Sequence, residues 1–126
     1  MPTYSAPVRD MKFLLNEVLD ISQYGHLPRF EEAPQDLADA ILEEAAKFAE
    51  GVLQPLNMVG DIEGCTRNED GSVTTPPGFK DAFDQFVENG WPLLGAAPEY
   101  DGQNLPQVLG IEASEMMGTV KMSFAM

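Results

Sequence analysis

The sequence predicts an all-α domain of four main helices, and three observations support that class. Apolar residues recur every three or four positions in separate stretches, which is the period of an amphipathic helix. Gly and Pro residues fall between those stretches, where they interrupt helices. A hydrophobic content of 44% over 126 residues is ordinary for one folded domain. The helices are expected near residues 8–22, 34–53, 77–89 and 105–126, with one long loop or short hairpin at about 65–75.

An extended lead-in and the first helix occupy the start of the chain. Pro7 disfavours a helical conformation at Ala6, so the helix is predicted to begin at Val8. Gly25 is expected to lie beyond the helix end, and the only histidine, His26, follows in a connection. A single histidine without a recognisable partner is interpreted as a loop residue and not as a catalytic base. The apolar face of this helix is Met11, Leu14, Leu15, Val18 and Leu19.

The second predicted helix, residues 34–53, has a wide apolar face. Its main ridge is Leu37, Ile41, Ala45, Phe48 and Val52. A second row widens the ridge with Ala38, Leu42, Ala49 and Leu53. The alanines would let a neighbouring helix approach closely. Nothing in the pattern of the acidic residues indicates burial, so these four are interpreted as solvated carboxylates: Asp36, Asp39, Glu43 and Glu44.

A turn and the third helix follow. Residues 68–71 read Asn-Glu-Asp-Gly, a strong turn signal that predicts the loop or hairpin. Cys65, just before it, is interpreted as a small packing residue. Thr75 is the expected helix cap, with Pro76-Pro77 in the first turn. The stripe expected to lie in the core is Phe79, Ala82, Phe83, Phe86 and Val87.

A connecting stretch and the fourth helix complete the chain. Gly90 is expected to end the third helix in a left-handed conformation. An apolar cluster is predicted after it, from Trp91, Leu93, Leu94 and Tyr100. The fourth helix carries one apolar face, Leu109, Ala113, Met116, Met117, Val120 and Phe124. A second apolar side includes Ile111, Met122 and Met126, and no stop signal precedes the last residue.

Charge and composition restrict the function classes. Seven basic and 21 acidic residues give a net charge of −14, which repels nucleic acid and anionic membranes. No stretch approaches the roughly 20 apolar residues of a membrane span, and the N-terminus lacks an apolar signal region, which favours a cytoplasmic protein. The residues show no glycine-rich phosphate loop, no metal-ligand cluster and no catalytic constellation. Composition and spacing alone therefore predict a soluble helical domain.

Three motifs carry a resemblance to a known family. The connecting stretch reads GWPLLGAAPEYDGQNLP, the opening reads YSAPVRDMKFLL, and PLN is followed by GDIEG after the second helix. Together they resemble the N-terminal helical domain of acyl-CoA dehydrogenases, the FAD enzymes that desaturate acyl-CoA thioesters. The opening resembles an N-terminal extension in the branch that includes methylmercaptopropionyl-CoA dehydrogenase. Family members usually place two glycines where this chain has Asp101-Gly102.

The resemblance implies a role for the whole chain. Residues 1–126 would be the N-terminal helical domain, with 1–33 as the branch-specific extension and first helix. The FAD-binding β domain and the C-terminal bundle, which carries the catalytic glutamate, would be absent from these residues. FAD, an acyl-CoA substrate and an electron-transfer partner are implied for the complete enzyme, whereas the 126 residues alone are expected to be inactive and not to bind FAD.

The resemblance also implies a candidate substrate site. In the family, the end of the fourth helix forms one wall of the acyl pocket. The corresponding residues of this chain are Met122, Ser123, Phe124 and Met126. Packing of these side chains against later domains remains an equal alternative. A second function class, a free-standing acidic helical module that binds a partner protein through this helix, also remains open.

We predict that the two-faced fourth helix makes the isolated chain self-associate or fray after about Gly118. Three preceding helices can cover one face, and each large apolar side chain left in water forgoes about 1.5–3 kcal/mol relative to full burial. Replacing both Met122 and Phe124 by Glu should give a soluble monomer with the first three helices intact, as measured by sedimentation. A wild-type monomer whose terminal turns are well protected from hydrogen exchange contradicts this expectation.

Overall fold

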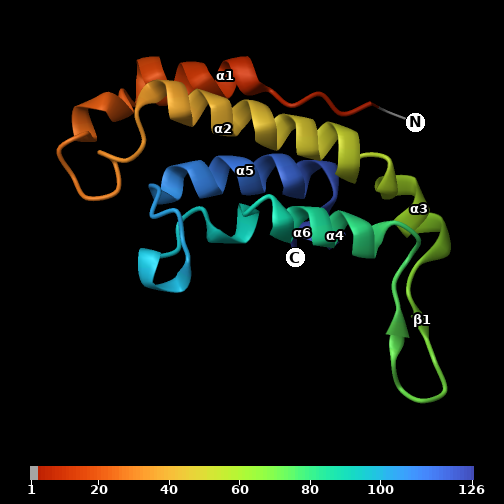
Figure 1. Ribbon diagram of the computed structural model, residues 1–126. Coiled ribbons are helices and arrows are strands. Elements are labelled where there is room, and N and C mark those ends of the chain that lie inside the picture. The colour runs from red at the N-terminus through yellow and green to blue at the C-terminus, as the bar shows by residue number, and fades with distance from the viewer. Residues whose placement is uncertain (1–2) are drawn as a thin grey trace.

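Helices α2 (Gln35–Phe48) and α5 (Gln107–Val120) pack side by side and form the centre of the fold. The computed structural model describes residues 3–126. Helix α1 (Val8–Phe13) lies along the side of α2 that is turned away from α5 (Figure 1). Helix α4 (Phe79–Glu88) runs along the other side of α5 in the same view. The helical class predicted from the sequence is confirmed.

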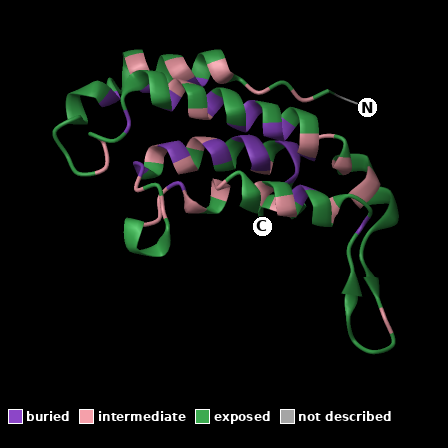
Figure 2. Cartoon of the chain, viewed as in Figure 1, coloured by how far each residue is buried: buried purple, intermediate pink, exposed green. Residues whose placement is uncertain are grey.

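The core lies between α2 and α5, where the buried side chains gather (Figure 2). Helix α2 and the π-helical turn that continues it, η3 (Ala49–Leu53), contribute Ala38, Leu42, Ala45, Ala46, Phe48, Ala49 and Leu53. Helix α5 contributes Leu109, Ala113, Met116, Met117 and Val120. The row predicted to widen the α2 ridge is thus fully buried, whereas Leu37 of the main ridge is 40% exposed. The buried face of α2 is rotated relative to the predicted one.

The first helical stretch is shorter and less buried than predicted. Helix α1 continues into a π-helical turn, η1 (Leu14–Val18), and a separate 3-10 turn, η2 (Ile21–Tyr24), follows. Asp20, with φ of 46°, separates the two segments and breaks the helix predicted for residues 8–22. Only Met11 and Leu15 of the predicted face are buried, because the stretch packs against α2 on one narrow side. The other three residues of that face are exposed: Leu14, Val18 and Leu19.

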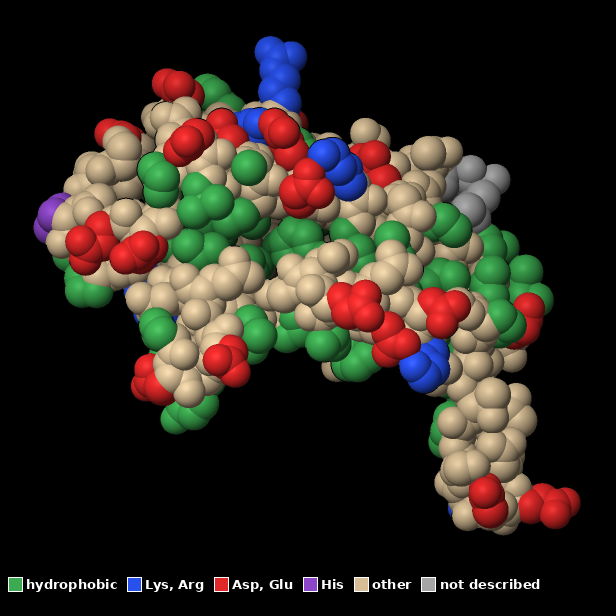
Figure 3. Space-filling model, in the orientation of Figure 1, with side chains coloured by type: hydrophobic (Ala, Val, Ile, Leu, Met, Phe, Trp, Pro, Cys, Tyr) green, Lys and Arg blue, Asp and Glu red, His purple; other side chains and the backbone are tan. Residues whose placement is uncertain are grey.

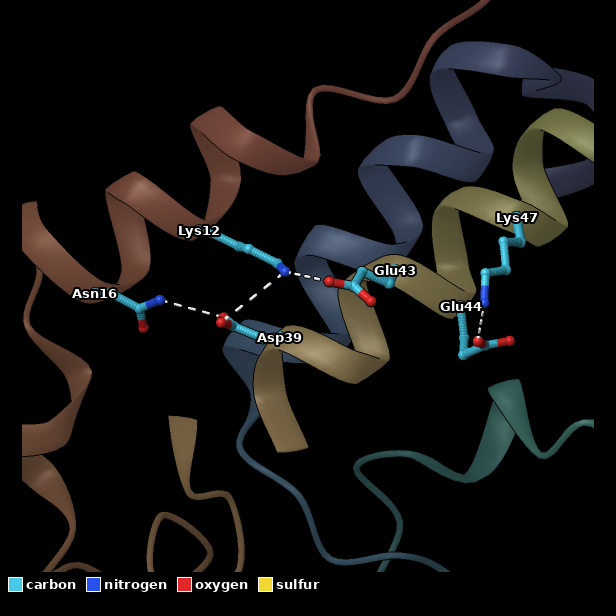
Figure 4. Close-up of polar contacts among 6 residues, drawn as sticks. All are labelled: Lys12, Asn16, Asp39, Glu43, Glu44 and Lys47. Atoms are coloured by element: carbon cyan, nitrogen blue, oxygen red, sulfur yellow. Dashed lines mark hydrogen bonds and ion pairs between the residues drawn. The ribbon is translucent and has the colours of Figure 1, made fainter. Parts of the chain in front are cut away.

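Polar contacts hold α1 and η1 against α2 on the outside of the core (Figure 4). The Lys12 ammonium donates a hydrogen bond to the Glu43 carboxylate and lies 3.9 Å from an oxygen of Asp39. The amide of Asn16 donates to Asp39 at 3.2 Å. The hydrogen bond from Lys12 lowers the pKa of Glu43, and the same bond raises the pKa of Lys12. Two carboxylates that the sequence assigned to solvent therefore join two helices.

A helix that the sequence did not predict, α3 (Leu56–Glu63), follows η3 after a two-residue turn. No helix is predicted for the stretch after Pro55, which contains Gly60 and Gly64. Pro at the start of a helix is compatible with helical backbone, since its missing N–H has no intrahelical partner there. Helix α3 has no buried residue. Cys65, which follows it, is exposed, so its interpretation as a packing residue is wrong.

The predicted hairpin is present and projects away from the helices (Figure 1). Strands β1 (Thr66–Arg67) and β2 (Val73–Thr74) pair antiparallel, with Thr66 opposite Thr74. The turn is closed by the N–H of Asn68, which donates to the Ser72 carbonyl at 2.8 Å. Gly71 supplies the left-handed backbone there, with φ of 86°.

Helix α4 begins later than predicted. Its first residue is Phe79, after Gly78 with φ of 83°, so Thr75 is not the cap and the two prolines precede the helix. A Cβ at Gly78 would also lie 2.7 Å from Cδ2 of Leu56, so this start depends on glycine. In the aromatic stripe, Ala82 is buried and Phe86 is half-buried, but Phe83 is 55% exposed. The stripe is therefore only partly core.

The connecting stretch folds back on itself through two 3-10 turns, η4 (Trp91–Leu93) and η5 (Pro98–Tyr100). Gly90 has the predicted left-handed conformation, and Asp101 also does, with φ of 61°. Asp tolerates this region better than most residues, which explains how a non-glycine residue can occupy it. Leu94 is buried as predicted, whereas Tyr100 is 73% exposed and lies outside the apolar cluster.

The last predicted helix is interrupted. Helix α5 ends at Val120, Lys121 adopts φ of −154° and ψ of 81°, and the short α6 (Met122–Ala125) follows. The predicted second apolar side is uncovered, since Ile111, Met122 and Met126 are all exposed. None of the helices formed by residues 3–126 is long and apolar enough to cross a membrane.

We predict that Gly102→Ala destabilises the fold through the connecting stretch. A Cβ at Gly102 would lie 2.0 Å from the carbonyl oxygen of Ala96. That oxygen accepts a hydrogen bond from the N–H of Asn104 at 3.0 Å, which helps to close the connecting stretch. The free energy of unfolding in urea should fall by about 1–3 kcal/mol, the usual cost of overpacking. The control is Gly51→Ala, a helical site with no atom within 4 Å of the added Cβ. Equal effects of the two substitutions would contradict the prediction.

Candidate functional site

Phe124 of α6 belongs to an aromatic cluster built by four elements. Its ring centroid lies 5.7 Å from that of Phe86 on α4, in an edge-to-face arrangement, and 6.4 Å from that of Phe48 on α2. The Phe48 ring lies 6.3 Å from the Trp91 ring of η4. Aromatic pairs at these separations are attractive beyond their buried area. The cluster therefore fixes the position of α6 against the helices and the connecting stretch.

An apolar groove borders this cluster. It has a volume of about 670 Å³ and runs between α4, the connecting stretch, α5 and α6; we call it the α5–α6 groove. Its apolar walls include Phe83, Phe86, Trp91, Met117, Phe124 and Met126. Gln107 and Ser114 are its polar side chains. No Lys, Arg, Asp or Glu side chain is among the described residues that line it, so the groove suits an uncharged apolar group.

A second hollow lies on the other side of Phe124. Its volume is about 360 Å³, and it is lined by Thr75, Phe79, Lys80, Phe83, Ser123 and Phe124. Phe83 and Phe124 also line the α5–α6 groove, so these two rings separate the hollows. Hydrophobic side chains also form a band across the face shown in Figure 3, with most carboxylates above and below it.

The structure brings together three of the four residues of the implied substrate site. Phe124 and Met126 line the α5–α6 groove, and Ser123 lines the second hollow beside Phe124. Met122 lines neither of these two hollows and is 62% exposed at the start of α6. Met126 is 95% exposed, so it forms a rim and not a packed wall.

Several groove residues were not predicted as site residues. Phe83 and Phe86 were assigned to the core, and Gln107, Gly110 and Ser114 were assigned no role. The available signal was the small residues of α5 at Gly110, Ala113 and Ser114, which share one helical face. Small side chains on an otherwise bulky helix leave space above that face.

Two further titratable groups with altered pKa values, Glu112 and Tyr4, do not line the α5–α6 groove. Burial raises the pKa of Glu112, and the neighbouring charge of Glu115 raises it further. Burial also raises the pKa of Tyr4, with additional effects of Glu115 and Glu50. Tyr4 belongs to the extended lead-in, which is held to η3 by the Ala6 N–H donating to Glu50 at 2.7 Å. The altered pKa values of Glu112 and Tyr4 therefore concern the stability of the fold and not the chemistry of the groove.

We predict that Glu112→Gln stabilises the chain at neutral pH. A carboxyl whose pKa is higher in the folded than in the unfolded state binds more protons when folded, so the stability of the wild type decreases as pH rises through that range. Replacing Glu112 by Gln, which does not ionise, removes this loss of stability. The gain in the free energy of unfolding should be present at pH 7 and disappear below about pH 4, under the unperturbed Glu pKa.

Chemical denaturation at pH 3.5 to 7.5 measures this dependence. Glu88→Gln, at an exposed position of α4, is the matched control. A Glu112→Gln protein whose advantage over the wild type grows toward acid would contradict the assignment.

Comparisons with known proteins point to a family. No protein-family model matches it. It is 40% identical over 124 residues to 3-methylmercaptopropionyl-CoA dehydrogenase of Ruegeria pomeroyi. The matched segment covers 98% of this chain and 21% of that protein. It is also 30% identical over 111 residues to the broad-specificity linear acyl-CoA dehydrogenase FadE5 of Mycobacterium tuberculosis. That match covers 86% of this chain and 18% of the relative.

The chain thus spans about a fifth of the length of the curated relatives that it matches. Both relatives are acyl-CoA dehydrogenases, and the near-complete coverage of this chain agrees with the three separated motifs that suggested the family. The comparisons therefore support an acyl-CoA dehydrogenase fragment.

Proposed function

We propose that residues 1–126 form the N-terminal helical portion of an FAD-dependent acyl-CoA dehydrogenase, an oxidoreductase of fatty-acid metabolism. In the complete enzyme, the chain would supply one wall of the pocket for the acyl group during α,β-desaturation of a thioester. Residues 1–33 would be the extension of this branch. The observation that carries the proposal is the apolar α5–α6 groove, which is lined by Phe124 and Met126, two of the four residues that the family resemblance indicated.

The chemistry of the groove supports an acyl ligand. Phe124, Phe86 and Met117 offer apolar surface, and the thioether of a methionine adapts to flexible chains. Ser114 and Gln107 are the polar groups available at the walls. We assign substrate contact to Met122, Ser123, Phe124 and Met126, with Phe124 as the fixed element because its ring is held by two others.

The residues that line the α5–α6 groove do not fit a flavin. A flavin needs hydrogen-bond partners around its ring and donors or cations for its pyrophosphate. The described residues that line the α5–α6 groove include no cation, and the net charge of −14 opposes a diphosphate. Any FAD and the catalytic base would therefore be supplied by parts of the enzyme outside the matched segment. In this proposal the enzyme is cytoplasmic and passes its electrons to a separate partner protein.

A second candidate function follows from the uncovered side of the last helices. Ile111, Met122 and Met126 are 57%, 62% and 95% exposed, respectively. Such side chains suit a contact with another protein or with a second copy of this chain. An acidic helical module that binds a partner through this surface would explain the exposure without any acyl ligand. The two functions differ in whether the groove residues affect substrate preference.

We predict that this chain can replace the matched segment of the Ruegeria pomeroyi relative and set its acyl-chain preference. In that chimera, Phe124→Ala enlarges the groove and should shift kcat/KM toward longer acyl groups by about tenfold, the scale of discrimination by one or two methylenes. The measurement is a series of saturated acyl-CoA substrates of increasing length.

Met58→Ala, an exposed methionine on α3, is the matched control and should leave the preference unchanged. An active chimera whose chain-length profile is unaffected by Phe124→Ala would refute the pocket assignment. A chimera that never retains flavin, although it folds, would favour the interaction module.

A further inference from the structure

Lys121 is a buried charged residue at the break between α5 and α6. Only 7% of its surface is exposed, whereas four of the five residues that follow it are exposed: Met122, Ser123, Ala125 and Met126. Its backbone leaves the helical region, and the chain changes direction there. A lysine is seldom buried unless its ammonium has partners. The contacts of this ammonium therefore bear on why the helix breaks at Lys121.

The ammonium lies in a socket formed by Asn57, Gly60 and Phe79. Its Nζ donates a hydrogen bond to the carbonyl oxygen of Asn57 at 3.2 Å and lies 5.3 Å from the centroid of the Phe79 ring. That separation is within the range of a cation–π attraction. A Cβ at Gly60 would lie 2.6 Å from Nζ and 2.8 Å from Cζ of Phe79. A methyl group at position 60 would therefore displace the Lys121 ammonium or the Phe79 ring.

The socket explains two sequence motifs that the groove does not use. Asn57 belongs to the Pro-Leu-Asn motif and Gly60 begins the Gly-Asp-Ile-Glu-Gly motif. Both lie on α3, which has no buried residue of its own. Leu56, at the start of α3, is partly buried against the core. The directional contacts of Lys121 join α3 to the end of α5.

The same residue also starts α6. The carbonyl of Lys121 accepts hydrogen bonds from the N–H groups of Phe124 at 3.0 Å and Ala125 at 3.2 Å. Phe79, on which the ammonium rests, lines the second hollow together with Ser123 and Phe124. A change in the Lys121 side chain is therefore transmitted to the wall residues through one turn of backbone and one aromatic ring.

We propose that Lys121 is a positioning residue, whose ammonium in the α3 socket fixes the direction of α6 and so places Ser123 and Phe124 on the walls of the two hollows. Lys121 does not touch the groove itself, because its Nζ points to α3. That the positioned residues contact an acyl group rests on the proposed function. The socket, the direction of α6 and their coupling do not depend on it.

Lys121→Met tests the coupling in this chain, because Met keeps an unbranched apolar stem and removes the ammonium. Hydrogen exchange is read at the amides of Phe124 and Ala125. Their protection should fall by about tenfold or more, the scale expected when a hydrogen bond to a charged group is lost, while the amides of α2 keep theirs. The emission of Trp91, the only tryptophan, should also shift, since it is linked to Phe124 through Phe48.

Gly60→Ala is the second variant, and it retains the lysine while occupying the socket. It should produce the same local loss of protection, which keeps the test decisive if Lys121→Met unfolds the chain. The control Lys47→Met removes an exposed ammonium that pairs with Glu44 on α2 and should change neither readout. Unchanged protection of α6 in both socket variants would overturn the proposal.

The chimera separates this inference from the proposed function. If α6 loses protection and the acyl-chain preference also changes, the positioning role and the pocket are both supported. If α6 loses protection but the preference stays constant, the socket is retained and the pocket assignment is wrong.

Discussion

The close packing of α2 on α5 is the constraint on which the rest of the structure depends. Three buried alanines lie at this contact: Ala45 on α2, Ala49 on the η3 turn that continues it, and Ala113 on α5. Small side chains let two helix axes approach, and larger residues such as Leu42 and Met116 then fill the remaining space. Because α5 is fixed in this way, the connecting stretch before it and α6 after it meet on one side. The α5–α6 groove lies where they meet.

Basic residues connect the outer elements to this centre in a strongly acidic chain. Lys12 joins the α1 segment to α2, Arg29 donates to the Gly95 carbonyl at 3.0 Å, and Lys121 joins the end of α5 to α3. Exposed ion pairs such as that of Lys12 contribute about 0–1 kcal/mol each, so the first connection guides packing more than it stabilises it. Lys121 differs because it is buried, and loss of its partners would leave an unpaired charge.

The sequence predicted the helical class, the hairpin, the left-handed Gly90 and the uncovered side of the last helix. Apolar periodicity and turn residues report these features locally. It did not predict α3, because a helix without a fully buried residue has no clear stripe to detect. It also did not predict the break at Lys121, whose ammonium contacts Asn57 and lies near Gly60, both far away along the chain. Likewise, Phe124 was identified through family resemblance, but its contacts with Phe48 and Phe86 depend on tertiary packing.

The central claim is that an apolar acyl group occupies the α5–α6 groove, and the methionines provide a direct probe of it. With ¹³C-labelled methionine methyl groups, the chain is titrated with an octanoyl thioester of a small neutral thiol, which avoids repulsion between CoA phosphates and the acidic protein. The account predicts shifts of the Met117 and Met126 methyl signals, which line the groove, while Met11 and Met58 stay unchanged. Equal shifts at all four methyl groups, or none at Met117 at saturating ligand, would contradict it.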